Sequence, residues 1–389
     1  MLKAYQYRLY PTKAQASSLR KTLDICRKVY NNTLALRRDA WEYDQRTASL
    51  FETNRELTVW KKEYPYLNEV HSQVLQNVQV RVDLAFKAYF RRVCEGADEL
   101  GYPRFKGKGR YDSLTYPQAY APGHKVDIQN QMVTLPKIGK IKGVFHRPVE
   151  GDIKTITVRR SSTGKWYLSV AVERPAVIRE HPGEEITGID LGLSSFATLS
   201  NGEHIANPRF FRTEEQELAR VQRKRDAIPK CSKARIRASE VVARVHERIR
   251  NKRSNFIHQT SRQLVDRFKL IAFEDLNIKK MLESDEPERT RKEKRALKRS
   301  ISDVAWGQMV RAAQNKAVDA GSSVVLINPC NTSQICSRCG KLVYKELKDR
   351  VHLCPFCGLS MDRDLNAAIN ILRLGTQSLS ARRIRSPVL

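Results

Sequence analysis

Four cysteines near the C-terminus place the strongest constraint on how this chain folds. They form two CxxC pairs, Cys336 with Cys339 and Cys354 with Cys357, and 14 residues separate the pairs. A glycine follows each pair and permits the tight turn that brings two thiolates onto one ion. Four thiolates favour a tetrahedral zinc ion, and such a site is closed and therefore structural. The alternative is a pair of redox-active CxxC motifs, which the doubled spacing disfavours, so we predict one structural Zn²⁺.

The charge of the chain indicates a polyanionic partner. The 389 residues include 71 Lys and Arg against 42 Asp and Glu, a formal net charge of +29. Such an excess opposes compaction unless an anionic partner neutralises it, and nucleic acid is the first candidate. A merely soluble basic protein and a basic membrane-surface protein are the alternatives. Because the apolar runs are too short to span a bilayer and the N-terminus has no apolar signal region, we expect a soluble, intracellular protein.

Apolar periodicity divides the chain into parts of different character. An opening strand, KAYQYRLYP, precedes two blocks of helical spacing, and residues 125–173 follow a β pattern with a hairpin around SSTG. This order predicts a helical insertion into a small β-barrel that the opening strand joins. From residue 183 onward, strands alternate with helices, and a helical stretch over 213–268 breaks near Pro229. The expected fold class is therefore α/β with additional all-β and all-α parts.

Three basic or polar segments are candidates for nucleic-acid contact. One face of the second helical block carries amides, which can read base edges, although such residues also simply solvate a helix. The segment GYPRFKGKGR alternates basic residues, glycines and aromatics without helical period, as in a loop that lies against phosphates. Residues 286–300 hold seven Lys or Arg against three Glu. This composition fits either a solvated helix face or a basic element near nucleic acid. The candidate contact residues are Gln73, Gln76, Asn77, Arg104, Lys106 and Lys108.

Three carboxylates stand at the ends of apolar segments that are far apart in the chain. Asp190 follows a strand-like run in TGIDLGLSS, the strand of LIAFEDL ends in the adjacent acids Glu274 and Asp275, and Asp364 lies in the first turn of a predicted helix, where the helix dipole favours an acid. Adjacent strand residues face opposite sides, so only one of Glu274 and Asp275 can share a site with Asp190. A like-charge cluster is costly unless metal ions occupy it. Paired Mg²⁺ ions on the order of 4 Å apart suit phosphodiester cleavage.

Taken together, these motifs resemble those of the TnpB family. The matching segments are GIDLGLSSFATLS, LIAFEDLNIKKM, NTSQICSRCG, CPFCG and MDRDLNAAINIL, and KAYQYRLYPT and GYPRFKGKGR extend the resemblance over nearly the whole chain. TnpB proteins are transposon-encoded, RNA-guided DNA endonucleases related to the single-effector RuvC CRISPR nucleases. The resemblance implies an RNase H-like RuvC domain whose acids, in the order Asp, Glu, Asp, are Asp190, Glu274 and Asp364, with Mg²⁺ as their cofactor. The DxN step of the family selects Asp364 over Asp362.

The resemblance also implies a domain organisation and partners. The implied domains are a wedge β-barrel (1–12 and 105–180), an inserted helical recognition domain (13–104), a RuvC-like nuclease domain (181–330 and 361–375), an inserted zinc ribbon (331–360) and a disordered basic tail (376–389). The implied partners are a guide RNA from the right end of the transposon and double-stranded target DNA with an adjacent motif, bound by a monomer. The implied location is the prokaryotic cytoplasm, in association with the nucleoid. The alternatives are a catalytically silent RNA-guided repressor and an unguided transposase, whose acids usually run Asp, Asp, Glu.

Overall fold

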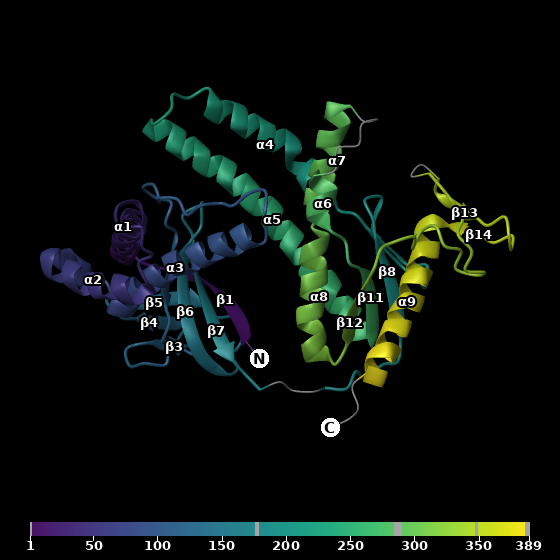
Figure 1. The fold of residues 1–389 in the computed structure, drawn as a ribbon, viewed down its shortest axis with the longest axis horizontal. Coiled ribbons are helices and arrows are strands. Elements are labelled where there is room, and N and C mark those ends of the chain that lie inside the picture. Colours follow the sequence, from purple (N-terminus) through teal and green to yellow (C-terminus); the bar gives the residue numbers. More distant parts are fainter. Residues whose placement is uncertain (1, 176–178, 284–289, 347–348, 386–389) are drawn as a thin grey trace. The chain divides into compact units, whose positions relative to one another are not determined.

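The computed structural model of the chain describes residues 2–175, 179–283, 290–346 and 349–385 (Figure 1). The chain divides into two compact units, Met1–Ala176 and Val177–Leu389, which are described separately. No helix in the described ranges is both long enough and apolar enough to cross a membrane.

The first unit is built on a seven-stranded antiparallel sheet with the strand order β2-β6-β7-β1-β5-β4-β3. The strands are β1 (Leu2–Tyr10), β2 (Ser113–Tyr116), β3 (Lys125–Asp127), β4 (Met132–Leu135), β5 (Gly139–Val144), β6 (Asp152–Arg160) and β7 (Trp166–Glu173). The predicted hairpin is confirmed, because Ile156 pairs with Val170 and Val158 with Leu168. Every second residue of β7 is buried, as expected of a strand with one face on a core.

The sheet of the first unit is not closed by strand pairing where the sequence predicts a barrel. The strand order ends at β2 on one side and β3 on the other, and no pairing joins these two among the residues that the structure describes. The two strands are only four and three residues long, so each offers few backbone groups for such a pairing.

Helices fill the long connection between β1 and β2, as the predicted insertion requires. They are α1 (Lys13–Asp44), α2 (Leu50–Glu63), the short 3₁₀ helix η1 (Pro65–Glu69) and α3 (Ser72–Cys94). A capping box starts α1, because Thr12 accepts a hydrogen bond from the backbone N–H of Gln15 while the Gln15 side chain accepts one from the backbone N–H of Thr12. The predicted apolar stripe of this helix, including Leu19, Leu23 and Leu34, lies in one core with the buried face of the sheet.

The second unit contains a five-stranded mixed sheet with the order β10-β9-β8-β11-β12. Its strands are β8 (Ile186–Leu191), β9 (Ser195–Leu199), β10 (His204–Ala206), β11 (Leu270–Glu274) and β12 (Ser323–Ile327). Strand β9 is antiparallel to both β8 and β10, whereas β11 is parallel to both β8 and β12. Helix α9 (Arg363–Arg385) runs beside β8 and β11 (Figure 1). It approaches so closely that a Cβ at Gly188 would collide with the backbone of Ala368 and Leu372.

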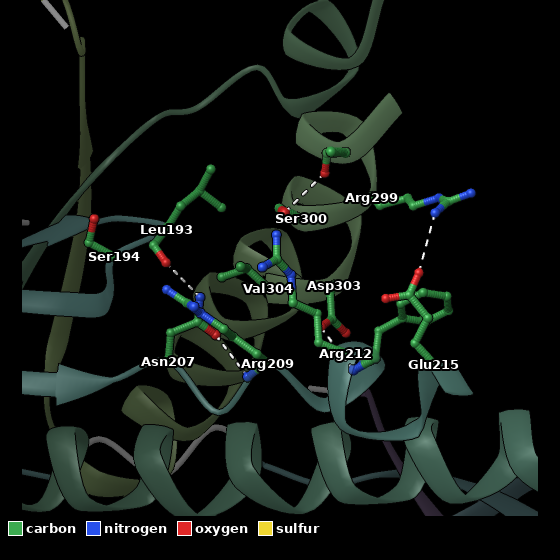
Figure 2. Close-up of a pocket in the computed structure, with 12 residues that line it drawn as sticks. Leu193, Ser194, Asn207, Arg209, Arg212, Glu215, Arg299, Ser300, Asp303 and Val304 are labelled. Carbon is green, nitrogen blue, oxygen red and sulfur yellow. Dashed lines mark hydrogen bonds and ion pairs between the residues drawn. The ribbon is translucent and has the colours of Figure 1, made fainter. Parts of the chain in front are cut away.

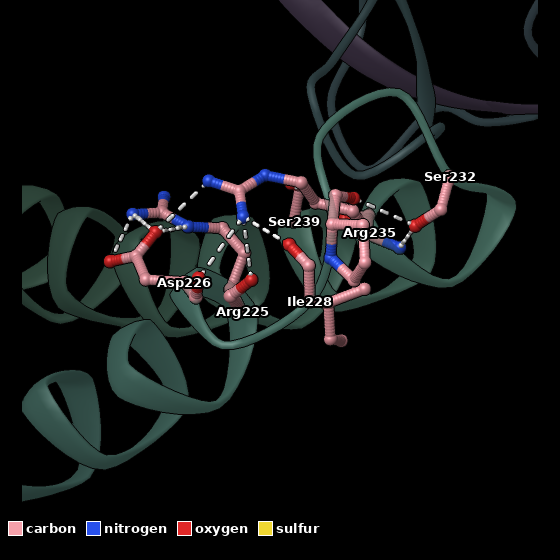
Figure 3. A network of polar contacts seen from close by, with 7 residues as sticks. Arg225, Asp226, Ile228, Ser232, Arg235 and Ser239 are labelled. Carbon is pink, nitrogen blue, oxygen red and sulfur yellow. Dashed lines mark hydrogen bonds and ion pairs between the residues drawn. The ribbon is translucent and has the colours of Figure 1, made fainter.

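The remaining elements of the second unit are mostly helical. They are α4 (Phe210–Asp226), α5 (Lys233–Arg267), α6 (Ile278–Glu283), α7 (Arg291–Val304), α8 (Trp306–Ala320) and the short strands β13 (Val351–Leu353) and β14 (Ser360–Asp362). The predicted break near Pro229 is confirmed as the turn between α4 and α5. Figure 3 shows how Arg235 holds this turn, because its guanidinium donates to the carbonyls of Arg225 and Ile228 at 3.0 and 2.6 Å.

The prediction of a disordered tail over residues 376–389 is wrong for residues 376–385, which continue α9. Leu379 packs against a cluster that includes Leu270 and Val325, so contact with the sheet stabilises the added turns. Tertiary packing of this kind supplies most of the stability of protein helices, and it outweighs the polar local sequence. The last four residues, 386–389, lie outside the described residues.

Candidate active site and metal centre

The four predicted zinc ligands form one compact group. The Sγ atoms of Cys336, Cys339, Cys354 and Cys357 all lie within 4.8 Å of one another, and two of the Sγ–Sγ distances are 3.6 Å. A tetrahedral ion with Zn–S bonds of about 2.3 Å requires sulfurs about 3.8 Å apart, so the donor set fits one zinc ion. The glycines after the two pairs both have positive φ, +74° and +70°. The sequence argument for tight turns at these positions is therefore confirmed.

Two buried asparagines of α9 bind the cysteine cluster to that helix, which the sequence analysis did not anticipate. The Asn366 side chain accepts from the backbone N–H of Ser337 at 2.9 Å and donates to the carbonyl of Ile335 at 2.8 Å. The Asn370 amide donates to the same carbonyl at 2.7 Å and to that of Thr332 at 2.9 Å. Both side chains are at most 1% exposed. The amides therefore satisfy backbone groups at the entrance to the first CxxC turn.

The three predicted acids approach one another from three elements. Asp190 lies near the end of β8, Glu274 ends β11, and Asp364 lies in the first turn of α9. The chain folds this way because β8 and β11 are parallel neighbours, whose carboxyl ends meet at one edge of the sheet, and because α9 packs on both. In the described part of the chain, the tight grouping of ligand atoms found for the four cysteines does not extend to these carboxylates. They converge within electrostatic range.

Burial and like charge act together on Asp190. Loss of solvation and the nearby carboxylates of Glu274 and Asp364 raise its pKa from 3.8 to about 8, and Arg363 opposes this effect. Burial likewise raises the pKa of Glu274. A nearby cation stabilises the ionised form of a carboxyl group that is buried and repelled by other carboxylates. The oxygen donors and their mutual repulsion therefore fit hard divalent ions such as Mg²⁺.

Glu274 is the member of its acidic pair that faces this point. It is 8% exposed, whereas the neighbouring Asp275 is exposed to solvent. The carboxylate of Glu274 accepts a hydrogen bond of 2.5 Å from the hydroxyl of Thr332, which is itself buried. Thr332 is a residue that sequence reasoning missed, because its partner lies 58 positions away and no local pattern marks it.

Asp362 and Asp364 have different surroundings at the start of α9. One carboxylate oxygen of Asp362 accepts from the backbone N–H groups of Asp364 and Leu365, at 2.8 and 3.0 Å. This is the hydrogen-bonding pattern of a helix N-cap. Asp364 instead contacts the guanidinium of Arg363 at 3.3 Å and adds its charge to the field at Asp190.

The candidate nucleic-acid residues lie in the first unit and differ in exposure. Gln76, Arg104 and Lys108 are exposed. The other three are half-buried and bonded within the protein: Gln73 donates to Gln118, Asn77 accepts from Arg81, and the backbone N–H of Lys106 donates to Asn31. These candidates lie in the first unit and the three acids in the second, so the two groups are described separately.

Family models match three segments of the chain. A model described as "Probable transposase" (OrfB_IS605) matches residues 167–285, and a "Cas12f1-like, TNB domain" matches residues 306–371, which include the cysteines. An OrfB_IS605 "Helix-turn-helix domain" matches residues 1–46, where the structure contains β1 and the single helix α1.

Similarity to whole proteins extends over nearly the entire chain. A Streptomyces pristinaespiralis protein named "Putative RNA-guided DNA endonuclease" is 34% identical over 96% of this chain and 89% of its own length. InsQ of Escherichia coli K12, which carries the same description, is 31% identical over 96% and 92%. The Cas12f1 chain in a complex with sgRNA and target DNA shares the fold, with a TM-score of 0.53 at 16% identity over 92% of this chain and 83% of that one. The chain therefore belongs to the TnpB family of IS605-type transposon proteins, as its motifs predict.

Proposed function

We propose that this protein is an RNA-guided DNA endonuclease of a transposon, which cuts double-stranded DNA beside a short motif with one RuvC-type site. The observation that carries the proposal is the convergence of Asp190, Glu274 and Asp364 from β8, β11 and α9. The order β10-β9-β8-β11-β12, with three antiparallel strands followed by two parallel ones, supports an RNase H-like nuclease fold. The names of the relatives support guided cleavage of DNA.

Each acid has a distinct task in this proposal. Asp190, at the centre of the cluster, and Glu274, oriented by Thr332, offer carboxylate oxygens to metal ions, and Asp364 completes the set from the helix. Mg²⁺ ions held there would activate a water molecule and stabilise the departing oxygen of the phosphodiester. Arg363, beside Asp364, limits the net negative charge of the site and thereby its repulsion of a DNA phosphate.

The other parts of the chain are assigned by the same proposal. Residues 1–12 and 105–180 form the wedge, 13–104 the recognition helices, 181–330 with 361–375 the nuclease domain, and 331–360 the zinc ribbon. A guide RNA from the right end of the transposon binds the basic protein, which acts as a monomer and reads the motif beside the target. Base pairing then reads the remaining sequence, as in other RNA-guided effectors. The net charge of +29 supports this assignment, because guide and target both need neutralising.

The test is cleavage by the protein expressed together with the DNA that flanks its gene. We expect one RNA species to copurify, and its end to specify a DNA target that is cut in Mg²⁺. Asp190→Ala should retain the RNA and lose cleavage, whereas Asp275→Asn, which changes an exposed neighbouring carboxylate, should cut like the wild type. Full-rate cutting by Asp190→Ala would refute the acid assignment. Guided binding without cutting by the wild type would indicate a silent repressor, and absence of a specific RNA would indicate an unguided transposase.

A further inference from the structure

A pocket in the second unit opens beside the connection that follows Asp190. It has a cavity volume of about 370 Å³, within the usual range for small-ligand sites. One wall is the β8–β9 turn with Leu193 and Ser194, another is the start of α4 with Arg209 and Arg212, and α7 closes the pocket through Arg299 and its neighbours (Figure 2). The turn begins only two residues after Asp190, so whatever lies in this pocket is close in the chain to the proposed catalytic carboxylate.

Hydrogen bonds connect the walls of the pocket to one another. The side chain of Asn207 donates to the carbonyl of Leu193 at 2.9 Å and accepts from the backbone N–H of Arg209 at 3.1 Å. The backbone N–H of Phe211 donates to Asp303 of α7 at 2.9 Å. Arg209 has a left-handed conformation with φ of +47°, which non-glycine residues adopt only at a cost. These hydrogen bonds connect the walls of the pocket and hold Arg209 in an unfavourable backbone conformation.

The charges of the pocket are unevenly matched. Glu215 pairs with Arg299 at 3.3 Å (Figure 2), and Asp303 pairs with Arg253 at 2.5 Å, so both acids of the pocket already have a partner. Arg209 and Arg212 are exposed, and their guanidinium groups have no ion pair with any residue that the structure describes. Two guanidinium groups that line one pocket and have no acidic partner present donors that suit a phosphate.

We propose that this pocket binds one nucleotide of the DNA strand that is presented to the acids, with its phosphate on Arg209 and Arg212. The inference rests on the proposed function and adds to it a positioning site on the strand. The partly buried Leu193 and Phe211 and the buried Val304 provide apolar surface for the sugar and base, while the guanidinium groups bind the backbone without reading sequence. Both arginines act as positioning residues by fixing the register of the strand relative to Asp190.

The test compares Arg209→Gln/Arg212→Gln with a control, Arg220→Gln, which removes an arginine of the same helix α4 that lies outside the pocket and is already paired with Glu217. Binding of a fluorescent single-stranded DNA oligonucleotide to the full chain is measured in EDTA over a series of salt concentrations. Hydrogen bonds to charged groups predict a loss of affinity of about tenfold or more for the double variant. The slope of log K against log salt should fall by about 0.7 for each phosphate that the variant no longer neutralises. The control should retain the wild-type slope.

Two further measurements make the result decisive. With a guided target and Mg²⁺, the double variant should show a raised KM for target DNA at an unchanged affinity for guide RNA and an unchanged melting temperature. Wild-type affinity and slope in the double variant would overturn the inference, and so would a selective loss of guide RNA, which would make the pocket an RNA site. Because the oligonucleotide assay needs no cleavage, an inactive wild type would count against the proposed function alone.

Discussion

Replacement of Asp190 by asparagine should stabilise the metal-free protein, although it should abolish cleavage. Burial and the charges of Glu274 and Asp364 raise the pKa of Asp190 from 3.8 to about 8. Between these values the folded state binds a proton that the unfolded state has released, so the free energy of unfolding falls as pH rises through this range. At about 1.4 kcal/mol per pKa unit, the full difference is on the order of 5 kcal/mol. Asparagine does not ionise, so its side chain does not incur this cost as pH rises.

The gain in the free energy of unfolding depends on how much of the cost of ionising Asp190 the asparagine variant avoids. The amide still needs hydrogen-bond partners, so we expect a net gain of about 2 kcal/mol or more near pH 8 and little gain near pH 5. For a unit of this size, about 2 to 4 °C accompanies each kcal/mol, which predicts a rise in melting temperature of roughly 4 to 8 °C. The assay is thermal unfolding in EDTA at both pH values, with Asp275→Asn as the control for removal of an exposed acid.

Addition of Mg²⁺ supplies the second half of this test. A cation that binds the folded carboxylates stabilises them by mass action, so Mg²⁺ should raise the melting temperature of the wild type and have little effect on Asp190→Asn. A gain that is equal at both pH values would show that the substitution acts through packing. A variant less stable than the wild type near pH 8 would refute the view that the three acids repel one another in the folded protein.

Three other changes test the supporting structure. Removal of zinc with a chelator, or Cys354→Ser, should unfold the cysteine cluster and abolish cleavage while the first unit keeps its protection in hydrogen exchange. Gly188→Ala should cost about 3 kcal/mol or more in thermal unfolding, because its Cβ would collide with α9, whereas Gly107→Ala, which has open space and no positive φ, tests the loss of a glycine alone. Thr332→Val should lower kcat about tenfold at an unchanged guide affinity, since Glu274 loses its orienting hydroxyl, and Thr332→Ser should restore most of the rate.

The features that sequence predicted best are those with a local signature. The CxxC pairs, the capped amphipathic α1 and the apolar strands that end in Asp190 and Glu274 are all visible within about ten residues, since local spacing determines each of them. Local spacing alone does not predict that Asp190, Glu274 and Asp364 lie near one another. It depends on the parallel pairing of β8 with β11 and on the close approach of α9, which the resemblance to a family supplied and the residues alone did not.

What sequence did not predict depends on contacts between distant residues. Three contacts join segments that no sequence periodicity connects. They are the hydrogen bond from Thr332 to Glu274, the amide contacts of Asn366, and the hydrogen bond from Asn207 to Leu193 in the pocket lined by Arg209 and Arg212. The extension of α9 past residue 375 has the same origin, because the apolar contacts of Leu379 with the sheet are invisible in a polar local sequence.

Contacts of the cysteine cluster with its neighbours explain why it lies between the second and third acids in the sequence. The chain leaves β12, reaches Thr332, which fixes Glu274, and then enters the first CxxC turn. It returns from the second turn directly into α9, where Asp364 precedes Asn366 by two residues and Asn366 binds back to the backbone of the first turn. The same short segment therefore holds one acid by a hydroxyl and the helix of another by an amide. A zinc ion bound by the four cysteines would keep that segment rigid, and it would thereby help to set the spacing of the three carboxylates.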